Sequence, residues 1–88
     1  MELVARVAIV TGAATRLGRA QALALAEQGA RLVIHYNTSA GPAAEVVRHI
    51  QSMGSDAIAV QADLSRPMDA PAIVEQAVGH FGRVDILV

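Results

Sequence analysis

The chain has 88 residues and a formal net charge of −1, so it forms at most one small domain. This charge gives no indication of nucleic-acid or membrane binding. Hydrophobic residues make up 53% of the sequence and aromatic residues only 2%. A composition dominated by small aliphatic side chains suits a parallel sheet that helices cover on both faces.

The N-terminal residues and the cysteine count predict a cytoplasmic protein. Residues 1–6 lack the basic start and apolar core of a signal peptide, and no apolar run reaches the roughly 18 residues of a membrane span. A chain without cysteine fits a reducing compartment. All seven basic residues are arginine, so these residues supply no lysine amine to a reaction.

Apolar segments alternate with helical patterns along the whole chain. The predicted strands are 7–10, 32–35, 57–60 and 86–88, and the predicted helices are about 16–28, 42–53 and 69–81. This alternation predicts βαβ units, and right-handed crossovers give a parallel sheet in the order 3-2-1-4. We expect a Rossmann-type, three-layer α/β/α fold. The last strand would be an uncovered apolar edge, so residues 1–88 are expected to be the N-terminal, dinucleotide-binding part of a larger doubly wound domain.

Local rules add detail to the helices. Pro42 is placed at the first position of the second helix, where its missing N–H costs little. Asp69 is placed as the N-cap of the third helix, which puts Pro71 in the first turn, and a short 3₁₀ turn is expected over 66–68. The positions expected to face the sheet are Leu17, Ala20 and Ala24 in the first helix, Ala43, Val46, Val47, Ile50 and Met53 in the second, and Ile73, Val74, Ala77, Val78 and Phe81 in the third.

The segment 7–18, VAIVTGAATRLG, predicts a strand, a glycine loop and the first turn of a helix. Gly12 allows a tight turn after the strand, and Gly18 allows the helix to pack close to the sheet. The first N–H groups of a helix lack partners and carry partial positive charge, so Thr15, Arg16 and Leu17 are candidates for binding a phosphate. The alternative is an ordinary strand-to-helix turn.

The second strand ends in residues that indicate the choice between NAD(H) and NADP(H). NAD-preferring folds place a carboxylate about 20 residues after the glycine loop, on the ribose 2′-hydroxyl. Here that position falls on Tyr36, Asn37, Thr38 and Ser39. These residues would not repel a 2′-phosphate, and Arg16 from the facing loop could hold it. The sequence therefore favours NADP(H) over NAD(H); otherwise Tyr36 caps the sheet and Arg16 is merely solvated.

The third strand ends in Asp63, Leu64 and Ser65, beside the first loop in this topology. The Asp63 carboxylate could accept the adenine amino group while the main chain of Leu64 completes the recognition. Alternatively, these residues form only a turn in which Ser65 bonds locally. His35 either borders the site or is a packed histidine at a strand end, which is the favoured interpretation. Asp85 is expected to be structural, and no residues have the spacing of metal ligands.

Four motifs in this order resemble the short-chain dehydrogenase/reductase family. They are TGAATRLG at 11–18, HYNTS at 35–39, ADLS at 62–65 and FGRVDILV at 81–88. Arg16, where the family usually has its middle glycine, and the pair His35-Tyr36 look most like the pteridine reductase branch, and similar sequences occur among 3-oxoacyl-[acyl-carrier-protein] reductases. Thr38 differs from the basic residue that often completes the 2′-phosphate pocket.

The resemblance implies an NADP(H)-dependent reduction of a carbonyl or pteridine-type substrate by hydride transfer, in a homo-oligomer. The family's acid is a tyrosine with a lysine four residues later. Tyr36 is the only tyrosine here and residue 40 is alanine, so no catalytic residue is assigned. Two alternatives remain open. The chain could be a stand-alone, non-catalytic nucleotide-binding half-domain that associates through its open sheet edge, or an inactive truncated remnant.

Overall fold

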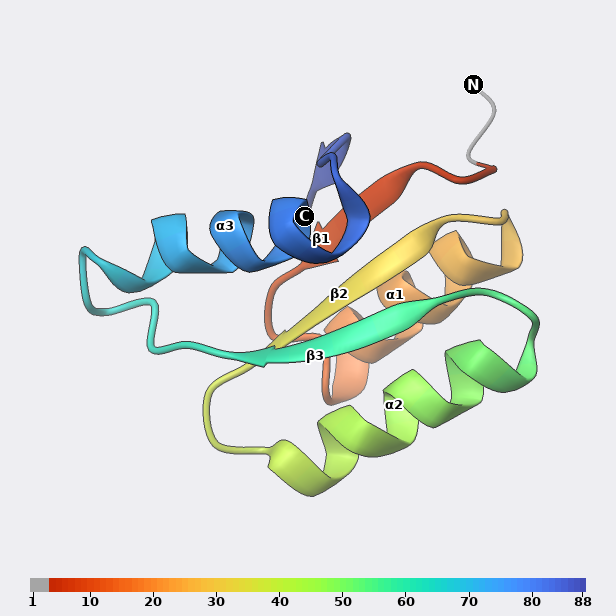
Figure 1. Ribbon diagram of the computed structural model, residues 1–88. Helices are drawn as coiled ribbons and strands as arrows, with labels where there is room; N and C mark the ends of the chain where they lie inside the picture. The colour runs from red at the N-terminus through yellow and green to blue at the C-terminus, as the bar shows by residue number, and fades with distance from the viewer. Residues whose placement is uncertain (1–3) are drawn as a thin grey trace.

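The strands form one parallel sheet in the order β3-β2-β1-β4 in the computed structural model, which describes residues 4–88 (Figure 1). The strands are β1 Val7–Val10, β2 Arg31–Tyr36, β3 Ala57–Gln61 and β4 Ile86–Leu87. The helices between them are α1 Arg16–Glu27, α2 Ala40–Ser52 and α3 Asp69–Phe81. The predicted strand order and alternation are therefore confirmed.

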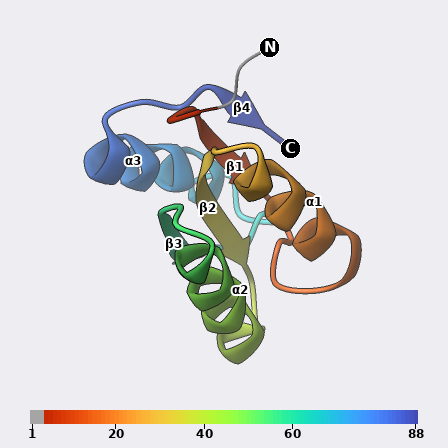
Figure 2. The same cartoon turned by 90° about the vertical axis from the view of Figure 1, so that its right-hand side faces the viewer.

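Helices cover both faces of the sheet, which gives the three layers that the sequence predicts. Figure 2 shows α3 on one side of the strands and α1 and α2 on the other. Successive strand residues point to opposite faces, so Ala8 and Val10 of β1 pack in the cluster under α1 and α2. Val7 and Ile9 pack in the cluster under α3. This two-sided burial explains why β1 is apolar at every position.

Two helices begin differently from the prediction. Helix α2 begins at Ala40 rather than Pro42, because the carbonyl of Ser39 already accepts the first helical bond from Ala43. Pro42 is then the third helical residue, where its missing N–H still costs nothing. Helix α3 has Met68 and not Asp69 at its N-cap. The expected 3₁₀ turn over 66–68 is a single hydrogen-bonded turn, closed by the Asp69 N–H on the Arg66 carbonyl.

The predicted buried face of α1 is wrong. Leu17 is 71% exposed, and the helix buries Ala22 and Ala26 instead. Alanine and leucine occur on all sides of α1, so their spacing does not single out one face. In α2 the expected Ala43, Val46 and Ile50 are buried, and in α3 only Ile73 and Ala77 are. No helix among residues 4–88 is long and apolar enough to cross a bilayer.

Asp85 holds β4 to β1 at the amino-terminal edge of the sheet, as expected for a structural residue. Its carboxylate accepts from the Val7 N–H at 2.9 Å and from the guanidinium groups of Arg83 at 2.6 Å and Arg6 at 3.3 Å. The bond from Arg83, followed by that from Val7, lowers the pKa of Asp85 from 3.8 to about 2. Both bonds favour the ionised form.

This lowered pKa predicts a stability loss in acid. A carboxyl with a lower pKa in the folded state stabilises the fold above its unfolded pKa. We therefore expect the contribution of Asp85 to be complete above pH 4, to fall as pH decreases from 3.8, and to be gone below its folded pKa of about 2. Urea unfolding at pH steps across this window measures it. Asp85→Asn should be less stable at neutral pH and should lose less stability than the wild type on acidification; parallel curves for the two proteins would contradict the prediction.

Candidate functional site

Three predicted segments meet at the carboxyl edge of the sheet. In Figure 1 the chain leaves β2 and β3 at the left of the view, and the loop after β1 lies beside them. The ladder between β2 and β3 runs to Tyr36 and Gln61, so 36–39 and 62–65 emerge side by side. The glycine loop 11–18 is joined to β2 by a bond from the Ala13 N–H to the His35 carbonyl. In open parallel sheets, ligands bind at this edge.

Gly12 and Gly18 make the glycine loop compact. Gly12 has φ +60°, a left-handed conformation that favours glycine. A Cβ on Gly18 would overlap the carbonyl oxygen of Gly12 and lie 2.8 Å from its carbon. The close approach that requires Gly18 is therefore to the loop itself, and not to the sheet as the sequence suggested.

The first turn of α1 offers free donors to an anion. Thr15 is the N-cap with an extended backbone, its hydroxyl does not cap the helix, and the first turn holds no acidic residue. The first backbone bond of the helix is donated by Arg19. Within the described part of the chain, the N–H groups of Leu17 and Gly18 have no hydrogen-bond acceptor. Unpaired N–H groups at a helix start form an anion site.

Arg16 sits in the loop in a strained conformation. Its φ is +54°, where L side chains cost about 1 kcal/mol. The side chain is exposed and makes no ion pair or hydrogen bond with any residue from 4 to 88. Within the described residues the guanidinium is thus available to a ligand, and a glycine at this position would adopt the same φ without the cost of a Cβ.

The loop after β2 presents polar groups at the same edge. Tyr36 is half-buried and packs against the core cluster under α1 and α2. Asn37 accepts from the Gln61 side chain through its carbonyl oxygen at 3.1 Å. Thr38 is exposed, and Ser39 precedes α2 without capping it through its side chain. The hydroxyls of Thr38 and Ser39 are not engaged by the helix that follows.

The turn after β3 orients a carboxylate. Asp63 accepts from the N–H of Ser65 at 2.9 Å and from its hydroxyl at 2.6 Å, both on the same oxygen. The hydroxyl bond first, then the N–H bond, lowers the pKa of Asp63 below its ordinary value. Among residues 4–88 the other oxygen has only the Arg66 guanidinium near it, at 3.9 Å, so it can accept a further donor. The local turn that the sequence allowed as an alternative is therefore present.

A largely apolar groove of about 570 Å³ lies beside this turn, between α3 and the strands β1 and β4. Its wall includes Leu64 and Thr11 from the carboxyl edge, with Val74 and Val88. Leu64 is 46% exposed, so the groove is open next to Asp63. An aromatic base has apolar faces that such a wall can cover.

His35 is the buried polar side chain of the described core, 4% exposed. Its Nδ1 accepts from the Gly12 N–H at 3.0 Å, and its Nε2 lies 2.9 Å from the Ala62 carbonyl oxygen. The favoured interpretation, a packed histidine at a strand end, is confirmed. The His35 side chain also contacts two of the three segments. Asp69 and Gln61 also form hydrogen bonds to the backbone of these segments. The sequence did not predict these hydrogen bonds, because their partners are backbone groups 6 to 27 positions away, which can be of any residue type.

Sequence and structure comparisons give the relationships of the chain. Residues 6–88 match the family described as short chain dehydrogenase. Tetrahydroxynaphthalene reductase PfmaG of Pestalotiopsis fici is 43% identical over 83 residues, which cover 94% of this chain and 30% of that protein. Versicolorin reductase stcU of Emericella nidulans is 46% identical over 82 residues, or 93% of this chain and 31% of that protein.

A solved short chain dehydrogenase from Burkholderia cenocepacia in complex with NADP superimposes with a TM-score of 0.94 and 39% identity, over 99% of this chain and 36% of that one. The chain thus spans about a third of the length of the proteins that it matches. The family model covers nearly every residue, and the fold and strand order agree with the resemblance carried by the four motifs. The chain belongs to the short chain dehydrogenase family.

Proposed function

We propose that residues 1–88 form the NADP(H)-binding part of a single Rossmann domain in a reductase of carbonyl compounds. The observation that carries the proposal is the meeting of three segments at the carboxyl edge of the sheet. They supply helix N–H groups, a guanidinium and a carboxylate oxygen, none of which is fully paired within residues 4–88. The similarity to a structure solved with NADP supports the choice of cofactor.

Each segment takes one part of the dinucleotide in this proposal. Gly12, Thr15, Leu17 and Gly18 form the loop and helix start that receive the pyrophosphate. Arg16 meets the 2′-phosphate. The polar groups following β2 complete that pocket, from Tyr36, Asn37, Thr38 and Ser39. Asp63, Leu64 and Ser65 recognise adenine at the edge of the apolar groove.

The catalytic acid belongs to residues outside this segment. When bound, the nicotinamide supplies a hydride to the carbonyl carbon of the substrate, and a proton completes the alcohol. Tyr36 packs against the core, and the sequence 1–88 has no lysine to lower the pKa of a tyrosine. What these residues do is bind and orient the cofactor; we assign no catalytic residue among them.

We consider two substrate classes. The relatives named for hydroxynaphthalene and versicolorin reduction favour a polycyclic phenolic ketone. The combination of Arg16 with His35 and Tyr36, which resembles pteridine reductases, supports a pterin as the second candidate. In a protein that carries both this segment and the catalytic residues, the loss of NADPH absorbance at 340 nm with one ketone and with one pterin distinguishes them.

Titration with NADPH and NADH tests the proposal itself. Quenching or enhancement of the reduced nicotinamide fluorescence gives Kd for each cofactor. We expect NADPH to bind more tightly than NADH. Binding without turnover of any substrate in a protein that ends at Val88 would favour the non-catalytic half-domain, and no binding of either cofactor would overturn the proposal.

Asp63→Asn should raise the Kd for NADPH and the Kd for NADH by the same factor, because the adenine amino group is common to both cofactors. A lost bond to a charged acceptor corresponds to about tenfold or more in Kd. Asparagine keeps an oxygen for Ser65, so the turn should survive. Fluorescence titration of both cofactors measures the effect. Ser65→Ala is the control for the turn, and a loss confined to NADPH would instead place Asp63 near the 2′-phosphate.

A further inference from the structure

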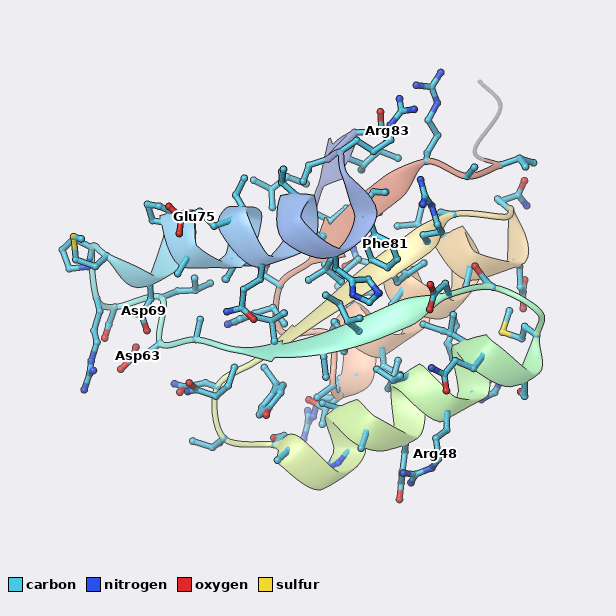
Figure 3. All side chains as sticks on the ribbon, in the orientation of Figure 1. Arg48, Asp63, Asp69, Glu75, Phe81 and Arg83 are labelled. Carbon is cyan, nitrogen blue, oxygen red and sulfur yellow. The ribbon has the colours of Figure 1, made fainter. Side chains whose placement is uncertain are left out.

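The peptide group between Ala62 and Asp63 is held by side chains at both of its polar ends. The Ala62 carbonyl oxygen lies 2.9 Å from Nε2 of His35. The Asp63 N–H donates to the carboxylate of Asp69 at 2.9 Å. Figure 3 shows Asp63 and Asp69 next to each other where the chain passes from β3 to α3.

The same imidazole also holds the glycine loop. Nδ1 of His35 accepts from the Gly12 N–H at 3.0 Å. An amide N–H can only donate and a carbonyl oxygen can only accept, so the imidazole is neutral and carries its hydrogen on Nε2. One chain of hydrogen bonds therefore runs from Gly12 through His35 and the 62–63 peptide to the first residue of α3.

The sheet ladder does not hold this peptide. The last ladder-type bond between β2 and β3 is donated by the Ala62 N–H to the Tyr36 carbonyl. For the next carbonyl and the next N–H, His35 and Asp69 are the partners found among residues 4–88. Ala62 is only 3% exposed, so water is a poor substitute for the imidazole. The orientation of this peptide directs the Cα of Asp63, and with it the carboxylate.

We propose that His35 and Asp69 are positioning residues for cofactor binding, which fix Asp63 relative to the glycine loop by clamping the peptide between them. This inference rests on the proposed function, since it assigns the clamp to the adenine side of the same site. Neither residue touches the cofactor in this scheme. Loss of the clamp lets the carboxylate turn away from adenine while the strands stay paired.

The variants separate the bonds one by one. Asp69→Ala removes the acceptor for the Asp63 N–H, and Asp69→Asn keeps an oxygen in its place. His35→Asn keeps an acceptor near Nδ1 for Gly12 and loses the donor to Ala62. His35→Gln reaches the Nε2 position, so it keeps the donor to Ala62 and loses the acceptor for Gly12.

The probe is adenosine 2′,5′-bisphosphate, which carries adenine and the 2′-phosphate without the nicotinamide; its Kd is measured by calorimetry on the purified protein. We expect Asp69→Ala to raise this Kd about tenfold and Asp69→Asn to restore most of the affinity. His35→Asn should raise the Kd comparably. When Asp69→Ala is added to His35→Asn, the Kd should rise by a much smaller factor than when it is added to the wild type. When Asp69→Ala is added to His35→Gln, the Kd should rise by nearly the same factor as in the wild type.

Asp56 provides a matched control. Its carboxylate also accepts from a backbone N–H, that of Ala57 at 2.8 Å, but at the other end of β3. Asp56→Ala should lower the melting temperature without changing the Kd. If Asp69→Ala does not fold, Asp69→Glu keeps the charge and displaces the acceptor by one methylene, and an intermediate Kd is expected.

The outcomes separate the two proposals. If the wild type binds neither the bisphosphate nor NADPH, the proposed function fails. If the wild type binds and the Asp69 and His35 variants only melt earlier with an unchanged Kd, the clamp is purely structural and this inference alone is overturned. Additive losses in the double variant of His35→Asn and Asp69→Ala would also overturn it, because two groups that act through one peptide must be coupled.

Discussion

Gly18→Ala should abolish tight cofactor binding and destabilise the fold. The added Cβ would overlap the Gly12 carbonyl oxygen and lie 2.8 Å from the carbonyl carbon. Both groups are backbone, so no rotamer change relieves the clash, and either the loop or α1 must move. Overpacking of this kind costs about 1–3 kcal/mol, which in a domain this small lowers Tm by at least about 4 °C. We expect the Kd for NADPH to rise by more than about tenfold, because the displaced N–H groups no longer converge on the phosphate.

Gly79→Ala is the matched control for this prediction. Gly79 lies in α3, and a Cβ there would meet nothing within 4 Å. In a helix interior, alanine is favoured over glycine by roughly 0.5–1 kcal/mol. The control should therefore raise Tm slightly and leave NADPH binding unchanged. Thermal melts and fluorescence titrations of both variants measure Tm and the Kd for NADPH. If Gly18→Ala had the Tm and the Kd of the wild type, the prediction would be wrong and the loop would accommodate the added Cβ.

Arg16→Ala should weaken NADPH much more than NADH. Among the described residues no carboxylate pairs with the Arg16 guanidinium. Of the two cofactors, only NADPH carries the 2′-phosphate that this guanidinium could bind. A charge-assisted hydrogen bond is worth about 1.5–3 kcal/mol, so the Kd for NADPH should rise between roughly tenfold and 150-fold. The Kd for NADH should stay nearly constant. The ratio of the two Kd values, measured at one ionic strength, is the quantity to report.

Two further variants separate charge from backbone strain at this position. Arg16→Gly removes the guanidinium but adopts the φ of +54° without cost, so its melting temperature should be several degrees higher than that of Arg16→Ala. The Kd for NADPH should rise by the same factor in both variants. Arg48→Ala removes an exposed charge from the middle of α2 (Figure 3) and should leave both cofactors unaffected. Equal losses of NADPH and NADH in Arg16→Ala would assign Arg16 to the shape of the loop.

The strands and their order could be predicted from the sequence, because the information is local. Short apolar runs such as 7–10 and 32–34 are buried on both faces, and their composition differs plainly from that of the segments between them. The right-handed crossover rule then leaves only a few orders for four parallel strands, and 3-2-1-4 is the order of the doubly wound dinucleotide-binding fold. The three chemical segments could be placed at one edge for the same reason, since each follows the carboxyl end of a strand.

Which side of a helix faces the sheet was decided by the tertiary structure. Leu17 is exposed at the start of α1 and Ala22 is buried, although both are apolar and both fit a helical repeat. A helix that is apolar on several sides can dock in more than one rotation, and contacts with β1 and β2 choose among them. The same limit explains Val74 and Val78 of α3, which periodicity placed on the sheet and which lie exposed.

The sequence by itself determined the alternating fold, the strand order and the three segments of the candidate cofactor site. Only the tertiary structure decided how those segments are held. His35, Gln61 and Asp69 act through backbone groups of residues 6 to 27 positions away. A bond to a backbone N–H or carbonyl requires no particular residue at the other end, so it leaves no motif in the sequence. Such bonds become visible only when folding brings the strand ends together.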